Sequence, residues 1–150
     1  MYDVLKYIHI IAAVVWVGGA FTSQLFAIKA QRSSDPVDLI RLGRLFEYVG
    51  LRVYAPASII LIIAGVLMTL DRWSFGQLWI SISLTLWLLS FLAGLFYLGP
   101  KSKTLAELFE REGPTSPEGV ALRSRLFLIS RTELVFFVII IALMVFKPGA

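Results

Sequence analysis

The chain has 150 residues, of which 58% are hydrophobic and only 16% are charged, and its mean hydropathy is +0.82. An average soluble domain has roughly 45–50% apolar and about 25% charged residues, so this composition excludes an ordinary soluble fold. The absence of cysteine excludes disulfides, iron–sulfur clusters, thiolate zinc sites, cysteine nucleophiles and covalently attached c-type haem. At this length we expect a single integral membrane domain over residues 1–150.

Four apolar stretches are long enough to cross the roughly 30 Å hydrocarbon core of a bilayer, which takes about 20 helical residues. They predict an all-α bundle of four transmembrane helices, with spans at about 5–28, 52–70, 77–99 and 126–146. Met1-Tyr2-Asp3 supplies no basic leader, and the first apolar run is longer than a signal-peptide core, so we expect this span to stay in the mature protein.

Lysine and arginine are concentrated in the segments that join spans one to two and three to four. These segments and their borders hold Lys29, Arg32, Arg41, Arg44, Arg52, Lys101, Lys103, Arg111, Arg123, Arg125 and Arg131, against Lys6, Arg72 and Lys147 on the other side. The positive-inside rule therefore predicts a multi-pass protein of the bacterial inner (cytoplasmic) membrane with both termini outside. Acidic residues are interleaved with the basic ones, and no basic run forms a phosphate-binding stripe, so we do not expect nucleic acid as a partner.

Both cytoplasmic connections carry helix signals, which predict short amphipathic helical pieces. Asp35-Pro36 with Asp38 resembles a helix start, and this helix is expected to run into span two, interrupted near Pro56.

In the second connection, Thr104 with Glu107 fits a capping box for a short helix that ends at Gly113-Pro114. Ser116-Pro117-Glu118 then opens the long fourth helix. On the other side, Trp73 and Trp79 are expected to form an aromatic belt at the membrane interface.

His9 is the only histidine and lies about one turn into the outer half of span one. Small residues and Trp16 follow at helical spacings, and such a face allows another helix or a flat cofactor to approach the backbone. An imidazole on this face could ligate haem iron or, alternatively, be an interfacial histidine hydrogen-bonded to a neighbouring helix. The residues of the stripe are Ala12, Ala13, Trp16, Gly19, Ala20 and Ser23.

Met68 and Met144 lie at about the depth of His9 and are candidates for a second iron ligand or, alternatively, ordinary gap fillers of the core. A polar cluster is expected at the inner ends of spans two and four, formed by Arg52, Tyr54, Arg131 and Glu133. It is interpreted either as an interfacial Arg–Glu clamp or as the entrance for a proton or a substrate. No catalytic triad, phosphate-binding glycine loop or paired carboxylate is present, so the sequence assigns no reaction and no catalytic residue.

The run His9-Ile-Ile-Ala-Ala-Val-Val-Trp16-Val-Gly18-Gly19 resembles the first-helix signature of the copper-resistance protein D (CopD) group and of HemJ-type protoporphyrinogen oxidases. Further matches to the HemJ-type proteins are Pro56, Gly65 and Met68 in span two, and Arg131, Glu133 and Lys147-Pro148 at span four. Overall the chain is most similar to an uncharacterised bacterial family of predicted four-helix integral membrane proteins (DUF2269-like) that shares this signature.

The resemblance implies haem b binding at His9 and, for HemJ-type members, oxidation of protoporphyrinogen IX. Those members have a second histidine after the signature, where this chain has Gln24-Leu25-Phe26-Ala27, and a lysine in the third helix, where it has apolar and hydroxyl residues. We therefore expect a module that binds haem b or a related porphyrin, with His9 as axial ligand beside Trp16, Gly18 and Gly19.

Two alternatives stay open: an enzyme of the porphyrinogen-oxidase kind, and a cofactor-free structural or copper-handling protein that uses His9 and the methionines. The lipid bilayer is the expected partner, a homo-oligomer would let two chains each supply a His9, and no redox partner is indicated.

Overall fold

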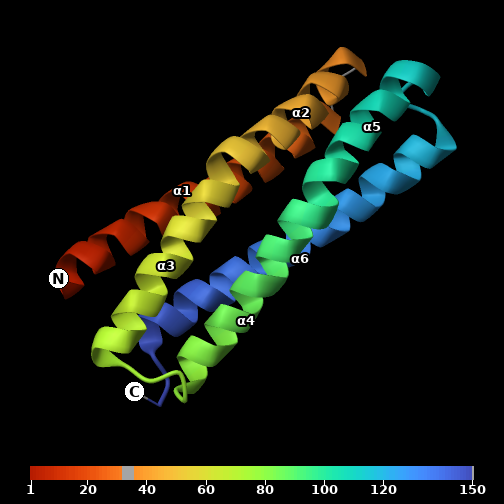
Figure 1. Cartoon of the computed structure of the whole chain (residues 1–150). Helices are drawn as coiled ribbons and strands as arrows, with labels where there is room; N and C mark the ends of the chain where they lie inside the picture. The colour runs from red at the N-terminus through yellow and green to blue at the C-terminus, as the bar shows by residue number, and fades with distance from the viewer. Residues whose placement is uncertain (32–35, 150) are drawn as a thin grey trace.

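The computed structural model describes residues 1–31 and 36–149, and within these ranges every regular element is a helix (Figure 1). The predicted all-α class is therefore confirmed. In chain order the elements are α1 (Tyr2–Gln31), α2 (Pro36–Val49), η1 (Gly50–Tyr54), α3 (Ala55–Arg72), α4 (Leu78–Ala93), η2 (Gly94–Leu98), α5 (Gly99–Glu112) and α6 (Pro117–Phe146).

Four helical rods are long and apolar enough to cross a membrane, at Tyr2–Lys29, Ile40–Arg72, Leu78–Glu112 and Pro117–Phe146. They contain the four spans predicted from hydropathy, except that Gln77 of the third span lies just before the rod. The second rod joins α2, η1 and α3 without a break, and the third joins α4, η2 and α5. The amphipathic pieces expected in the connections are thus extensions of the spans, since the helices continue beyond the apolar segments.

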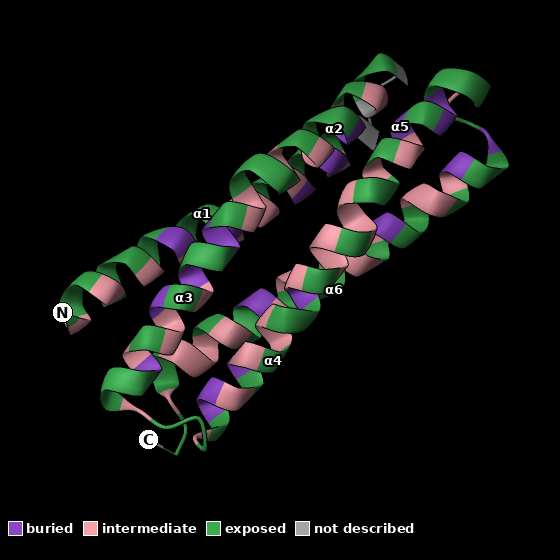
Figure 2. Cartoon of the chain, in the orientation of Figure 1, coloured by how far each residue is buried: buried purple, intermediate pink, exposed green. Residues whose placement is uncertain are grey.

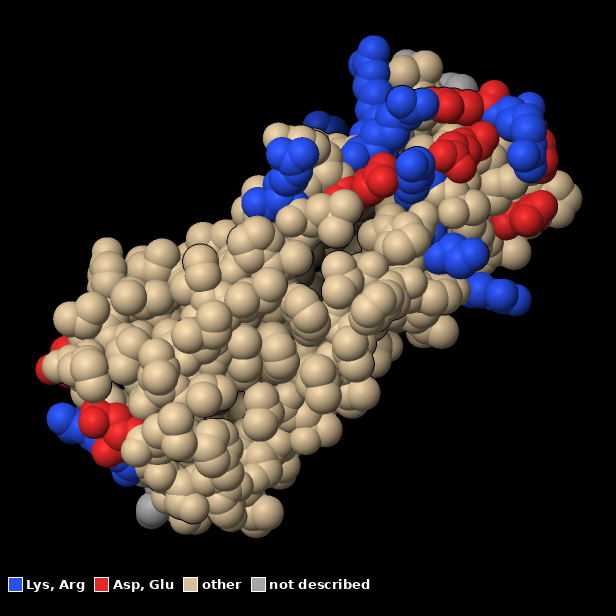
Figure 3. Space-filling view, viewed as in Figure 1, with Lys and Arg blue, Asp and Glu red and all other residues tan. Residues whose placement is uncertain are grey.

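The bundle has two chemically different ends (Figures 1 and 3). We call the end with α2, α5 and the start of α6 the basic end, and the end with Met1, the Arg72–Leu78 turn and Lys147 the termini end. In Figure 3 most blue and red side chains gather at the basic end, a few lie at the termini end, and the middle of the visible face is uncharged. A wide uncharged middle between two charged ends is what a bilayer-spanning protein requires.

The sequence signals at the helix boundaries are partly confirmed. The helix that contains α2 begins at Pro36, while Asp35 lies outside the described residues. The helix break predicted before Thr104 is wrong: α5 is already helical from Gly99, and the Thr104 hydroxyl donates to the Pro100 carbonyl one turn earlier (3.1 Å).

The end of α5 and the start of α6 were predicted correctly. Gly113 follows α5 with φ of 85°, a left-handed conformation that glycine adopts without strain. The Ser116 hydroxyl oxygen accepts from the Gly119 backbone N–H (3.2 Å), which caps α6 just before Pro117.

Both long composite rods contain one π-helical turn, and each turn begins at a glycine and is followed by a proline. In η1 the Ala55 N–H donates to the Gly50 carbonyl, and Pro56 comes next; in η2 the Gly99 N–H donates to the Gly94 carbonyl, and Pro100 comes next. A proline ring clashes with the carbonyl four residues earlier in a regular α-helix, so a widened turn lets the rod continue through the proline. The interruption expected near Pro56 is this turn.

The helices pack in neighbouring pairs: α1 against α3, α4 against α6, and α2 against α5. Figure 2 shows the buried residues as short patches between exposed stretches along each helix. The central cluster consists of Ala12, Trp16, Ala57, Leu61 and Phe137, and the Trp16 and Phe137 ring centroids are 4.6 Å apart. Small residues on α1 and α3 allow close approach of the two backbones, as is usual between membrane helices.

At the termini end, Trp73 and Trp79 form an edge-to-face pair with centroids 5.3 Å apart. The Lys147 ammonium lies over both rings, at 4.7 Å and 5.6 Å. The Trp73 indole N–H donates to the Tyr2 hydroxyl (3.3 Å). Trp79 is only 5% exposed, so this ring packs inside the bundle end instead of lying in an interfacial belt, and the aromatic group joins α1, α4 and the end of α6.

Candidate functional site

The His9 side chain lies between α1 and α3 in the half of the bundle near the termini end. Its Nδ1 is 2.8 Å from the Leu61 carbonyl oxygen. A carbonyl can only accept, so in the neutral ring Nδ1 carries the proton and the Nε2 lone pair is free. Among the described residues, Nε2 has no hydrogen-bond partner. The ring is therefore oriented by the protein and leaves one nitrogen to coordinate a metal.

Gly65 allows this position of the imidazole. A Cβ atom at Gly65 would lie 3.1 Å from His9 Cε1 and 3.3 Å from Nδ1, closer than almost all real contacts of that kind. With a side chain at Gly65 the ring would have to move by a few tenths of an ångström, so the glycine gives the imidazole room to reach the Leu61 carbonyl of the same helix, α3. In the sequence, Gly65 is marked only by the resemblance to the HemJ-type proteins, which does not indicate this role.

The other residues expected around a cofactor at His9 lie elsewhere. Trp16 is two turns along α1, about 10 Å away along the axis, and packs on Phe137 in the central cluster. Gly18 is exposed, and a Cβ there would meet nothing within 4 Å. Gly19 lies against the Tyr54 ring, where a Cβ would approach within 2.3 Å of Cε1. These three residues belong to the packing of α1 and its lipid-facing surface.

Met68 and Met144 are both half-buried in the part of α3 and α6 near the termini end. Met68 follows Gly65 by three residues, which places it about one turn further along α3. In the described part of the chain, no three His, Cys, Asp or Glu side chains come together as metal ligands. A metal at His9 would therefore have at most one further ligand of these residue types among the described residues.

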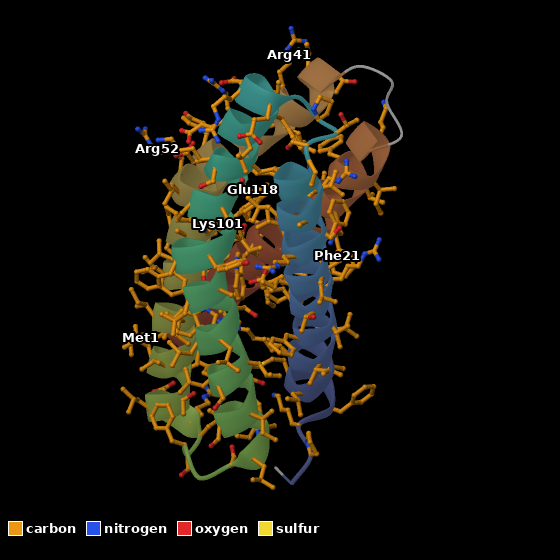
Figure 4. All side chains as sticks on the ribbon, turned by 90° about the vertical axis from the view of Figure 1, so that its right-hand side faces the viewer. Met1, Phe21, Arg41, Arg52, Lys101 and Glu118 are labelled. Carbon is orange, nitrogen blue, oxygen red and sulfur yellow. The ribbon has the colours of Figure 1, made fainter. Side chains whose placement is uncertain are left out.

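The four residues expected to form a polar cluster at the inner ends of spans two and four do not lie together. Arg52 is exposed, points outward in Figure 4 and lies 5.6 Å from the Tyr48 ring centroid. Arg131 is exposed as well and lies 5.5 Å from the Phe127 ring centroid. Tyr54 and Glu133 instead face inward. No ion pair joins Arg131 to Glu133 within the described residues, so the Arg–Glu clamp is absent.

Tyr54 and Glu133 line a cavity of about 210 Å³ enclosed by all four rods in the half near the basic end. Figure 3 shows a hollow in the surface at this level, beside the charged end. Both π-helical turns contribute to the wall, η1 through Gly50, Leu51 and Tyr54 and η2 through Gly94, Leu95 and Leu98. Widened turns of this kind occur often at functional sites. His9 does not line this cavity, so the surroundings of His9 and the cavity are two separate candidate sites.

Hydrogen bonds between helices fix several polar side chains in the cavity wall. The Tyr54 hydroxyl donates to the Gly19 carbonyl (3.0 Å) and is bonded to the Ser23 hydroxyl (2.8 Å). The Gln24 amide donates to the Ser130 hydroxyl (2.8 Å), which joins α1 to α6. In the sequence, Gln24 is marked only as a departure from the HemJ pattern. Its hydrogen bond to Ser130 could not be predicted, because the two residues lie on different helices and no motif connects them.

A family of predicted integral membrane proteins, DUF2269, matches residues 3–148, and the chain belongs to this family. Its description, an integral membrane protein without an assigned activity, agrees with the four apolar rods. No curated protein and no solved structure matches the chain.

Proposed function

We propose that the chain is a membrane-embedded protein that binds haem b through Nε2 of His9. The observation that carries the proposal is the 2.8 Å hydrogen bond from Nδ1 to the Leu61 carbonyl. Metal-ligating histidines almost always donate their other ring N–H to a carbonyl or carboxylate, which fixes the tautomer and the ring plane. The first-helix resemblance to haem-binding families supports the same residue.

His9 would hold the iron, and Leu61 and Gly65 would position the ring. When bound, haem would supply one-electron redox chemistry. The chain contains no second histidine. A second ligand to the iron would therefore be absent, or it would be Met68, Met144 or the His9 of a second copy. A methionine ligand would give a higher reduction potential than a bis-histidine pair.

Replacing His9 by glycine and adding imidazole tests this proposal on the purified protein. We expect the wild type to show a Soret band, His9→Gly to lose it, and free imidazole to restore it, because the small base can enter the space left by the side chain. Ile10→Ala, at an exposed position next to His9, should keep the wild-type spectrum. A Soret band in His9→Gly without imidazole would place the ligand elsewhere.

We further propose that the termini end faces outward and the basic end faces the cytoplasm, since ten of the thirteen Lys and Arg residues that the structure describes lie toward the basic end. The chain has no cysteine, so a single introduced cysteine is the only thiol of the purified chain that can carry label after reaction in intact cells. Cysteines at Ser74 and Gly149 should react fully with an impermeant maleimide, and those at Arg41 and Lys103 only after lysis. Labelling of Arg41→Cys in intact cells would reverse the orientation.

A further inference from the structure

The cavity near the basic end contains a carboxylate with no counter-charge. Glu133 lines the cavity and makes no hydrogen bond or ion pair with any residue that the structure describes. Arg131 faces outward on Phe127, and Arg123, although it lines the cavity, lies ten residues or about 15 Å nearer the basic end. A carboxylate within a membrane rod is costly unless it is partnered, and such a residue commonly marks a ligand or ion pathway.

Aromatic rings line the same cavity as Glu133. Phe137 lies one turn after Glu133, on the same face of α6, and its ring packs on Trp16. The cavity is also lined by Phe46, Tyr54, Phe91 and Phe127. Ring faces attract cations, and their edges and the neighbouring leucines favour an apolar body. The wall therefore combines one acidic side chain, Glu133, with surfaces that suit an organic cation.

Ser90 supplies a second, independent polar group. It is 2% exposed, lines the cavity from α4, and its hydroxyl has no hydrogen-bond partner within the described chain. Buried hydroxyls in native proteins are nearly always bonded. Four buried side chains of the described residues have an unpartnered polar atom, and only Ser90 among them lines the cavity, where a ligand could supply the partner. An N–H donor of the ligand would satisfy its oxygen.

From this combination we infer that the cavity binds an amphipathic primary ammonium compound, a single protonated amine on a compact apolar body. The ammonium group pairs with Glu133, the apolar body packs on the aromatic wall, and Ser90 offers an additional acceptor. An acidic side chain and aromatic rings disfavour an anion beside Glu133, and Arg123 lies nearer the basic end.

The probe is 2-phenylethylammonium, titrated calorimetrically into the protein in lipid nanodiscs, with empty nanodiscs subtracted. Its matched neutral analogue is propylbenzene, in which a methyl group replaces the ammonium, and its anionic analogue is 3-phenylpropanoate. We expect the wild type to bind the cation and to prefer it over both analogues.

Glu133→Gln should weaken binding of the cation by about tenfold or more, the factor that one charge-assisted hydrogen bond provides. Ser90→Ala should weaken it less. The control Glu118→Gln removes an exposed carboxylate in the first turn of the same helix and should leave the affinity within about twofold of wild type.

Ala20→Leu keeps Glu133 but adds volume to the cavity wall, and it should also weaken binding. It decides the matter if Glu133→Gln fails to fold. The proposal is overturned if the wild type does not bind the cation or binds propylbenzene as tightly. It is also overturned if the wild type binds 3-phenylpropanoate and Arg123→Gln abolishes that binding. Among the variants, a folded Glu133→Gln that binds the cation with wild-type affinity overturns it, and Ala20→Leu takes the place of Glu133→Gln if the latter does not fold.

Discussion

Gly19→Leu is expected to lower the melting temperature of the purified protein in detergent by about 5–10 °C. A Cβ at this position would lie 2.3 Å from Cε1 and 2.8 Å from Cζ of Tyr54. The ring cannot move aside freely because its hydroxyl is bonded to the Gly19 carbonyl and to Ser23. Overpacking of this kind costs roughly 1–3 kcal/mol or more, and about 1 kcal/mol corresponds to some 2–4 °C for a chain of this size.

Gly18→Leu is the matched control for this experiment. It makes the same change one residue away, where a Cβ would meet nothing within 4 Å, so its melting temperature should stay close to that of the wild type. The melting temperature of haem-free His9→Ala should lie between those of Gly18→Leu and Gly19→Leu, because this variant loses one hydrogen bond, worth roughly 0.5–1.5 kcal/mol. If His9→Ala loses as much as Gly19→Leu, the histidine is mainly a structural contact between α1 and α3.

Gly65→Leu is expected to reduce the affinity for haem by about 10–100-fold while His9 itself is unchanged. The new side chain would occupy the place of the imidazole, whose Cε1 would be 3.1 Å from the added Cβ. The ring would then lose its hydrogen bond to the Leu61 carbonyl, and loss of such an orienting partner typically costs 10–100-fold in metal affinity.

The measurement for Gly65→Leu is a titration of the haem-free protein with haemin, followed at the Soret band. Gly65→Ala should give a smaller loss, because only the Cβ atom is added. Gly18→Leu should bind as the wild type does. Unchanged affinity in Gly65→Leu would mean that the position of the imidazole seen here is unimportant for ligation.

The membrane rods could be predicted from the sequence because their hydropathy is continuous over whole spans. The ends of the rods at the basic end could not be predicted, since a capping signal such as Thr104 with Glu107 is also compatible with the middle of a helix. A signal for the π-helical turns was nevertheless present: Gly50 precedes Pro56 by six residues, and Gly94 precedes Pro100 by six. A glycine at this distance before a proline gives the backbone freedom to widen where the proline ring would clash.

The surroundings of the candidate residues depend on the register between helices, which one sequence does not reveal. His9 and Trp16 lie on one stripe of α1, yet His9 meets Gly65 of α3 while Trp16 meets Phe137 of α6. The separation of Arg131 from Glu133, in contrast, follows from helix geometry alone. Residues two apart differ by about 200° around the axis, so they face nearly opposite directions.

The most direct test of His9 as the ligand is the haem content of the protein produced with ample haem supply, measured as the pyridine haemochrome per folded chain. We predict stoichiometric haem b in the wild type, or half of that if two chains share one iron, and no haem in His9→Ala that elutes and melts as a folded protein. A folded but colourless wild type, or full haem retention by His9→Ala, would contradict it and leave a four-helix membrane bundle without haem at His9.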